Sequence, residues 1–291
     1  GHVRSDGTST SQGSRSTGSI PFLKVVDSEM LAVSQGVTRR GSYAAWYDVS
    51  HPEILEFLDM RKPTGGDSNR KALNLHHGVN LSNKFMRIID ACDRDPNANS
   101  DWELIDPHSK EVKDVVDARV IWQKIVENRA ETGEPFIAFI DTINEALPAE
   151  LKEDGLLVHH SNLCSEITLP TNENKTAVCC LSSLNLELWD EWKDDEMFIE
   201  DVIRFLDNIL EYFIQNAPVT MHKAILSAME ERSLGLGALG FHYLLMKKGI
   251  PFESAMATGL NRTIFKHIHT KATEATYVLG EERGCAPLLE G

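Results

Sequence analysis

The sequence predicts an α/β fold whose strands are largely parallel. Short apolar runs bounded by turn residues, such as 44–49 (AAWYDV) and 136–140 (FIAFI), are typical of buried strands. Amphipathic segments of about 10–18 residues separate them, as in strand–helix–strand units. The 291 residues are 42% hydrophobic, which is enough for a sizeable core. No repeat or clean linker follows residue 20, so one domain, or one piece of a domain, is the simplest interpretation.

The first half divides into clear elements after residue 19. Residues 1–19 are rich in Gly, Ser and Thr, with no hydrophobic period. They are either a flexible tail, which composition favours, or a loop that binds a ligand through backbone N–H groups, hydroxyls and Arg4 or Arg15. Ser50 is the expected N-cap of the second helix, and Gly133 the stop of the fourth. Helices are expected at 20–34, 51–61, 82–92 and 117–132, and strands at 44–49, 73–81 and 136–140.

A polar stretch at 93–116 interrupts the alternation of helices and strands, which then continues through the second half of the chain. Residues 235–240 read G-x-G-x-x-G, but a dinucleotide site needs a preceding strand and an acidic residue about 20 positions on. A helix precedes this motif and no acid follows at that spacing, so close backbone packing explains its glycines better. Strand-like segments are expected at 157–169 and 177–186, and helices at 198–215, 219–232, 241–248 and 256–283.

Charge and cysteine content exclude several classes of protein. The net charge of −15 argues against a general surface for nucleic acid or anionic membranes. No apolar run approaches the ~20 residues of a membrane span. Five scattered cysteines imply no disulfide framework, so a reducing cytoplasm is the default location. The vicinal histidine pairs split across strands, and no metal site is expected.

The segment 159–170 (HHSNLCSEITLP) carries the most chemical information. In an extended strand, Asn162, Cys164 and Glu166 share one face, backed by apolar residues on the other. An amide can bind a substrate hydroxyl, a thiol can act as a nucleophile or redox centre, and a carboxylate can move a proton. The alternative is a half-buried strand with a solvated polar face, which an arbitrary N-x-C-x-E pattern favours.

A second candidate is the pair Cys179 and Cys180. If their segment is extended, the two thiols face opposite sides, so at most one joins the face of Cys164. They lack C-x-x-C spacing, which disfavours a zinc or thioredoxin-like site. Buried free thiols are the simpler interpretation from spacing alone.

Taken together, the motifs resemble the large (alpha) subunit of class I ribonucleotide reductase. The resemblance covers nearly the whole chain, and it rests on the order and spacing of blocks that are individually weak. The blocks are 16–22 (STGSIPF), 34–41 (SQGVTRRG), 46–62, 69–70 (NR), 102–107 (WELIDP), 131–136 (ETGEPF), 161–167 (SNLCSEI), 182–186 (SSLNL) and 234–237 (LGLG).

This resemblance implies part of a ten-stranded α/β barrel, with a central finger loop whose cysteine becomes a thiyl radical. Cys164 matches that cysteine and would abstract the 3′ hydrogen of a ribonucleotide. Glu166 matches the residue that takes the 3′-hydroxyl proton, and Asn162 the one that binds the substrate hydroxyls. Cys179 matches one member of the redox pair that ends as a disulfide, although Cys180 stays possible.

The resemblance also implies effectors and partners. Residues 1–19, with Arg4, Gln35 and Arg39 as candidates, would lie at a site for a deoxynucleoside triphosphate or ATP effector, and 20–291 would form the partial catalytic barrel. No cofactor is expected in the chain itself. The partners would be a metal-containing, radical-generating small (beta) subunit, a ribonucleoside diphosphate, thioredoxin or glutaredoxin, and a second large subunit.

Several family features have no match here, among them the first redox cysteine, the phosphate-binding loop and the radical-passing tyrosines. The isolated chain is therefore expected to be an inactive internal piece. Two alternatives stay open. One is a cobalamin-dependent class II relative, whose motif more often has Pro where this chain has Leu163. The other is a non-catalytic fragment that binds a nucleotide or a partner.

Overall fold

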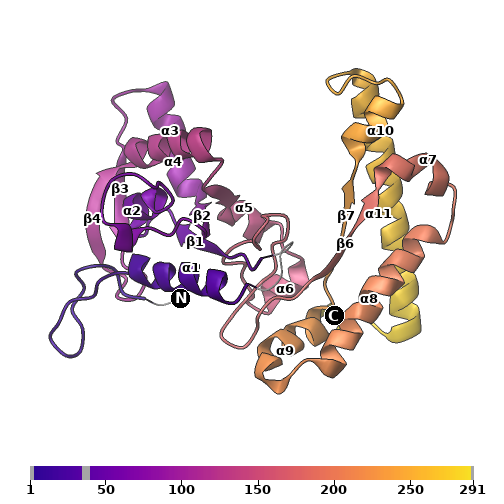
Figure 1. Ribbon diagram of the computed structural model, residues 1–291, viewed down its shortest axis with the longest axis horizontal. Coiled ribbons are helices and arrows are strands. Elements are labelled where there is room, and N and C mark those ends of the chain that lie inside the picture. The colour runs from indigo at the N-terminus through magenta and orange to yellow at the C-terminus, as the bar shows by residue number, and fades with distance from the viewer. Residues whose placement is uncertain (1–2, 35–39, 290–291) are drawn as a thin grey trace. The chain divides into compact units, whose positions relative to one another are not determined.

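The computed structural model describes residues 3–34 and 40–289, which form two compact units. The first unit contains residues 1–147 and 158–168, and the second contains 148–157 and 169–291. Figure 1 shows the helices and strands of both units. In the first unit the helices and strands are α1 (Ile20–Ala32), β1 (Ala44–Asp48), α2 (Ile54–Asp59), β2 (His76–Leu81), α3 (Asn83–Arg94), β3 (Asp101–Ile105), β4 (Val112–Asp117), α4 (Ala118–Thr132), β5 (Phe136–Phe139) and α5 (Ile140–Glu145).

The first unit is built on a parallel three-stranded sheet in the order β1-β2-β5. The predicted parallel pairing is therefore confirmed for this sheet. β2 is buried along nearly its whole length, because helices and loops cover it, and α4 packs on α2 and α3. The core collects large apolar side chains from every layer, including Phe57, Leu81, Phe85, Ile121 and Ile125.

Helix ends in this unit follow the expected capping chemistry in two places and depart from it in one. Ser82 accepts the backbone N–H of Phe85 and starts α3, and Gly133 ends α4 with a φ of +80°, a conformation that favours glycine. The prediction that Ser50 caps a helix from residue 51 is wrong. Residues 51–53 form turns, and α2 begins only at Ile54.

Residues 93–116 hold an antiparallel hairpin that the sequence pattern did not predict. β3 pairs with β4, with a register irregularity at Leu104 and Ile105. Only the inner face of β3 is apolar and buried, through Trp102 and Leu104, while β4 is mostly exposed. The alternation of polar and apolar residues in β3 is short and is flanked by polar residues, so it did not indicate a strand.

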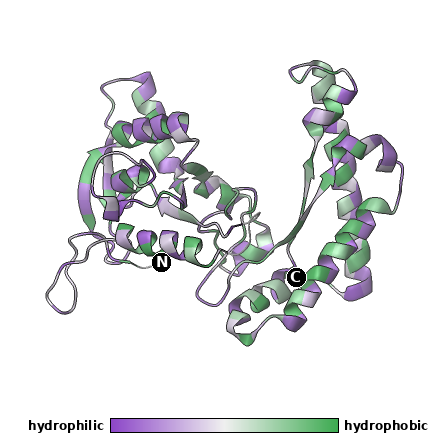
Figure 2. Cartoon of the chain, in the orientation of Figure 1, coloured by the Kyte–Doolittle hydropathy of each residue, from purple (hydrophilic) through white to green (hydrophobic). Residues whose placement is uncertain are grey.

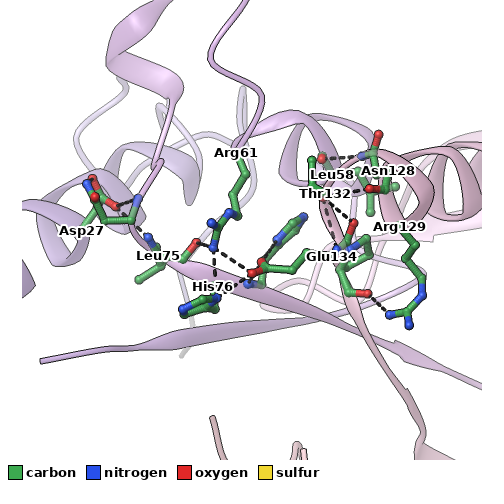
Figure 3. A network of polar contacts seen from close by, with 12 residues as sticks. Asp27, Leu58, Arg61, Leu75, His76, Asn128, Arg129, Thr132 and Glu134 are labelled. Atoms are coloured by element: carbon green, nitrogen blue, oxygen red, sulfur yellow. Dashed lines mark hydrogen bonds and ion pairs between the residues drawn. The ribbon is translucent and has the colours of Figure 1, made fainter. Parts of the chain in front are cut away.

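A buried carboxylate ties three elements of the first unit together (Figure 3). Glu134 accepts hydrogen bonds from Arg61 Nη1 at 2.9 Å, His76 Nδ1 at 2.6 Å and His77 Nδ1 at 2.9 Å. Burial alone would raise the pKa of Glu134, but the bonds from His77 and His76 and the charge of Arg61 lower it to about 2. The end of α2, the start of β2 and the turn before β5 are thereby held together.

The second unit contains a parallel pair of strands, β6 and β7, and a set of helices. Figure 2 shows hydrophobic and hydrophilic residues intermingled along its two long helices, α8 and α11, which pack on each other and bury one face each. Its elements are α6 (Ala149–Glu153), β6 (Cys180–Asn185), α7 (Trp189–Trp192), α8 (Phe198–Asn216), α9 (His222–Glu231), β7 (Leu234–Leu239), α10 (Phe241–Lys247) and α11 (Ala255–Arg283).

The glycine-rich motif 235–240 lies largely in β7, which runs parallel to β6. A Cβ at Gly237 would lie 3.2 Å from Ser183 Oγ, and Gly240 has a φ of +79°. Gly237 therefore allows close strand packing, as predicted, and Gly240 forms a turn that was not predicted. That the motif is itself a strand was not predicted, because its leucines alternate with glycines, which are poor strand formers.

Candidate active site

The segment around Cys164 is a loop, so the prediction of a strand over 157–169 is wrong. All of these residues are described, and none is in a strand. The Asn162 N–H donates to the Ile167 carbonyl at 3.0 Å, and the Ser165 N–H donates to the Asn162 carbonyl at 3.3 Å. Ser165 has a φ of +69°, which is incompatible with an extended strand. The local backbone bonds replace the ladder that a strand would need.

The three predicted residues all lie on this loop, defined here as the cysteine loop, residues 158–168. Asn162 lies at the closure of its tip, while Cys164 and Glu166 are exposed on residues 162–167. They lie on a tight turn of the chain and not on one face of a strand. Residues 162–166 thus carry an amide, an exposed thiol and an exposed carboxylate within one short turn.

The side chain of Asn162 has a structural bond and a free donor. Its Oδ1 accepts the Ile167 N–H at 3.1 Å, so the tip is closed by two bonds between the same two residues. The Ser161 hydroxyl donates to the Asn162 carbonyl at 2.8 Å. Because Oδ1 accepts an N–H, the other amide atom is Nδ2. Nδ2 has no partner within residues 3–34 and 40–289 and remains available to donate.

The start of the cysteine loop is held by side chains that sequence reasoning missed. Asn144, in α5, bonds both backbone groups of Val158, and Asn80, in β2, donates to the His159 carbonyl at 2.8 Å. Asn80 also lines a cavity of about 190 Å³, whose wall includes Asp48, Ser82 and Lys84. No sequence signal pointed to these two asparagines, because both contacts join separate segments of the chain.

Cys179 and Cys180 lie in the second unit, at the start of β6. Both are half-buried, and the Cys179 thiol donates to the Cys180 carbonyl at 3.6 Å. Burial, together with the negative charge of Asp207, raises the pKa of the Cys180 thiol. All five cysteines of the chain are described, and none of them forms a disulfide.

The Gly/Ser-rich segment is held by a carboxylate near each end, at Ser5 and at Ser19. Asp106 accepts bonds from the Ser5 backbone and hydroxyl, and Glu53 accepts the Ser19 N–H at 3.0 Å and its hydroxyl at 2.9 Å. Burial would raise the pKa of Asp106, but the bonds from Ser5 and from two backbone N–H groups hold it well below its usual range. The alternative of a flexible tail is therefore wrong for residues 3–19.

Of the three effector-site candidates, the structure places only Arg4. It is half-buried within this anchored segment, and its carbonyl accepts the Ser16 hydroxyl at 3.1 Å. Gln35 and Arg39 lie outside the described residues. Within the described residues, no group of three or more His, Cys, Asp or Glu side chains could hold a metal, and no helix is both long and apolar enough to cross a membrane.

Residues 1–291 match the family model for "Ribonucleotide reductase, barrel domain". The chain belongs to the ribonucleotide reductase family. Among its relatives, the putative ribonucleoside-diphosphate reductase large subunit of Frog virus 3 (isolate Goorha) is 49% identical over 95% of this chain and 48% of its own length. The large subunit of Invertebrate iridescent virus 3 is 44% identical over 94% of this chain and 51% of its own length.

A solved ribonucleotide reductase agrees with these matches. The class Id alpha subunit of Actinobacillus ureae is 31% identical, with a TM-score of 0.78 over 97% of this chain and 48% of its own. The chain thus spans about half the length of the curated relatives it matches. The α/β fold class and the membership of the barrel family are confirmed, and the cobalamin-dependent alternative is not favoured, since the solved relative is a class I enzyme.

Proposed function

We propose that this chain is the catalytic segment of a class I ribonucleoside-diphosphate reductase large subunit, which makes deoxyribonucleotides for DNA synthesis in the cytoplasm. The observation that carries the proposal is the position of Cys164, exposed on a loop that two hydrogen bonds close between Asn162 and Ile167. A cysteine that exchanges a hydrogen atom with a substrate must be reachable and held in place, and this loop provides both.

The proposed chemistry assigns a role to each side chain of the loop. The Cys164 thiyl radical takes the 3′ hydrogen of a ribonucleoside diphosphate, and Glu166 takes the 3′-hydroxyl proton. The free Nδ2 of Asn162 donates to a substrate hydroxyl. The 2′ carbon–oxygen bond breaks, and the 2′ hydroxyl leaves as water with a proton from one thiol of the redox pair. The second thiol supplies the hydrogen that replaces it at C2′, and the two sulfurs become a disulfide. Cys164 then returns the hydrogen atom to C3′, and Glu166 returns the proton to the 3′ oxygen.

Cys179 is the proposed member of this redox pair. Its partner would be the family's first redox cysteine, and thioredoxin or glutaredoxin would reduce the disulfide again. The raised pKa of Cys180 supports the choice of Cys179, because the thiolate is the reactive form in thiol–disulfide exchange. The thiyl radical itself would come from a metal-containing small subunit bound to a dimer of large subunits.

Residues 1–19 are proposed to form part of a regulatory site that binds an effector nucleotide. Residues 20–291 would form the partial barrel. Arg4, together with Gln35 and Arg39, would contribute to a site for a deoxynucleoside triphosphate or ATP, because guanidinium groups bind phosphate well. The two carboxylate anchors of the segment support this role, since they hold its backbone in a defined shape.

The decisive experiment replaces Cys164 by Ser in a large subunit that carries this sequence, reconstituted with a small subunit and a reductant. Loss of all turnover, with substrate binding kept, is expected. Retained turnover would show that the catalytic interpretation is wrong and would favour a fragment that only binds nucleotide or a partner. The matched control is Cys92→Ser, because Cys92 is buried in α3 and has no proposed role.

A further inference from the structure

No residue of the cysteine loop lies in a strand, yet both backbone groups of its first residue, Val158, are hydrogen-bonded. Asn144 Oδ1 accepts the Val158 N–H at 2.8 Å, and its Nδ2 donates to the Val158 carbonyl at 2.9 Å. Nδ2 also donates to the Ile140 carbonyl at 2.9 Å, which fixes the amide on its own helix. One side chain thus exchanges both bonds with one residue, as paired residues do in an antiparallel ladder.

The next residue of the loop is held from the sheet itself. Asn80, only 5% exposed in β2, donates from Nδ2 to the His159 carbonyl at 2.8 Å and to Asp48 Oδ1 at 3.0 Å. Both hydrogens of this amide are therefore used. Asp48 ends β1, so the bond to the loop is oriented by two neighbouring strands of the parallel sheet.

These contacts hold the cysteine loop on the N-terminal side of Cys164 and at its tip. Asn144 and Asn80 fix Val158 and His159, and the Asn162–Ile167 pair fixes the tip a few residues later. Between them, Ser161 is buried and its hydroxyl caps the Asn162 carbonyl. The only exposed part of the tip is the stretch with Cys164, Ser165 and Glu166.

We infer that Asn144 and Asn80 are positioning residues, which hold the start of the cysteine loop so that the Cys164 sulfur stays where it can meet a substrate. The inference rests on the proposed function of Cys164. Hydrogen transfer needs the reacting atoms about 3–3.5 Å apart, and a misplacement of about 1 Å can cost ~100-fold in rate. A loop held by side chains, and not by a strand ladder, depends on those side chains for that accuracy.

The test compares Asn144→Asp and Asn80→Ala in a large subunit that carries this sequence, reconstituted with its small subunit. Asn144→Asp keeps the shape and the acceptor but loses both donated bonds, and Asn80→Ala removes the bond to His159. The matched control is Asn128→Ala. Asn128 is a buried asparagine of α4 whose Nδ2 donates to the Leu58 carbonyl at 2.6 Å, away from the cysteine loop.

Two readouts separate positioning from general stability. The rate of backbone hydrogen exchange at 158–168 should rise at least 10-fold in both test variants. In Asn128→Ala this rate should stay unchanged, even if the melting temperature falls as much as in the test variants. The kcat should fall about 10- to 100-fold with little change in KM, because the substrate still binds. Asn144→Asp gives this information even if an alanine at the same position does not fold.

The outcomes distinguish this inference from the proposed function. If exchange at 158–168 and kcat in both variants match the control, the positioning role is wrong, although Cys164→Ser can still abolish turnover. If Cys164→Ser keeps its turnover, the proposed function fails, and faster exchange in the variants would then show only a structural support.

Discussion

Asn162 and Ile167 are joined by two hydrogen bonds, one between their backbones and one from the Ile167 N–H to the Asn162 side chain. The first could form with any residue except proline at position 162, whereas the second needs a side-chain acceptor there. Since Asn162 Nδ2 is free to donate, the closing of the loop and the proposed binding of substrate use different atoms of one amide.

Replacing Asn162 by Asp and by Ala should separate those two roles. Asp keeps the acceptor for the Ile167 N–H but cannot donate, so we expect the loop to stay closed and turnover to fall by about 100-fold, as when a donor at a reacting centre is lost. Ala should lose both. Hydrogen exchange at Ile167 and steady-state turnover measure the two effects. Faster exchange in the Asp variant would contradict the assignment.

Replacing Glu166 by Gln should remove the proposed general base without disturbing the loop. Its side chain is exposed and no hydrogen bond within the described residues holds it, so folding should be unchanged. Loss of a general base costs roughly 10²–10⁴-fold in rate. Glu173→Gln, an exposed change in a turn, is the control, and both are compared by kcat and melting temperature. A kcat within a factor of about two of that control would exclude Glu166 as the base.

The two adjacent cysteines should differ in the disulfide they form. Cys180 has a raised pKa because it is buried and close to Asp207, so less of it is thiolate at neutral pH. We expect Cys179→Ser to stop the reduction of the ribonucleotide by the cysteine pair. Cys180→Ser should keep most of the wild-type turnover. Mass spectrometry after a single turnover, without external reductant, should find the disulfide at Cys179. A disulfide at Cys180 would reverse the assignment.

Some elements of this fold are visible in the local sequence pattern, whereas others depend on contacts between distant residues. β1 and β5 were predictable because a buried parallel strand is a short apolar run, and β2 from a loose alternation over 73–81. α4 was predictable because its apolar period ends at a glycine with positive φ. The cysteine loop was not, since alternating polar and apolar residues do not require a strand. Its Asn162 side chain competes for the backbone bonds, which is typical of asparagine in turns. Asn80 and Asn144 act through long-range contacts that no local pattern shows.

The anchor of the N-terminal segment gives a test by proteolysis. Asp106 bonds Ser5 and Thr8, and its low pKa means that it stays ionised in ordinary buffers. Asp106→Asn weakens those charge-assisted bonds, each worth about 1.5–3 kcal/mol. We expect faster cleavage within residues 5–18 by a protease of broad specificity, and weaker binding of a deoxynucleoside triphosphate. Asp114→Asn, in exposed β4, is the control, and equal cleavage rates in the two variants would contradict the anchor.

Glu134 should make the free energy of unfolding depend on pH. Its folded pKa, about 2, is below the ordinary value of 4.5, so the folded state favours the ionised form. The resulting stabilisation is fully present above pH 4.5 and is lost as the pH falls toward 2. At 1.36 kcal/mol per pKa unit, the effect is about 3 kcal/mol in the free energy of unfolding.

Glu134→Gln should therefore lower the free energy of unfolding by about 3 kcal/mol at pH 7, and the gap to the wild type should narrow by more than half at pH 3. Urea unfolding at pH 7 and pH 3 measures this difference in the free energy of unfolding. Glu131→Gln is the control, because Glu131 is exposed and its ion pair with Lys62, at 3.3 Å, should contribute less than about 1 kcal/mol. A gap that stays constant between pH 7 and pH 3 would show that His76, His77 and Arg61 do not stabilise the ionised carboxylate.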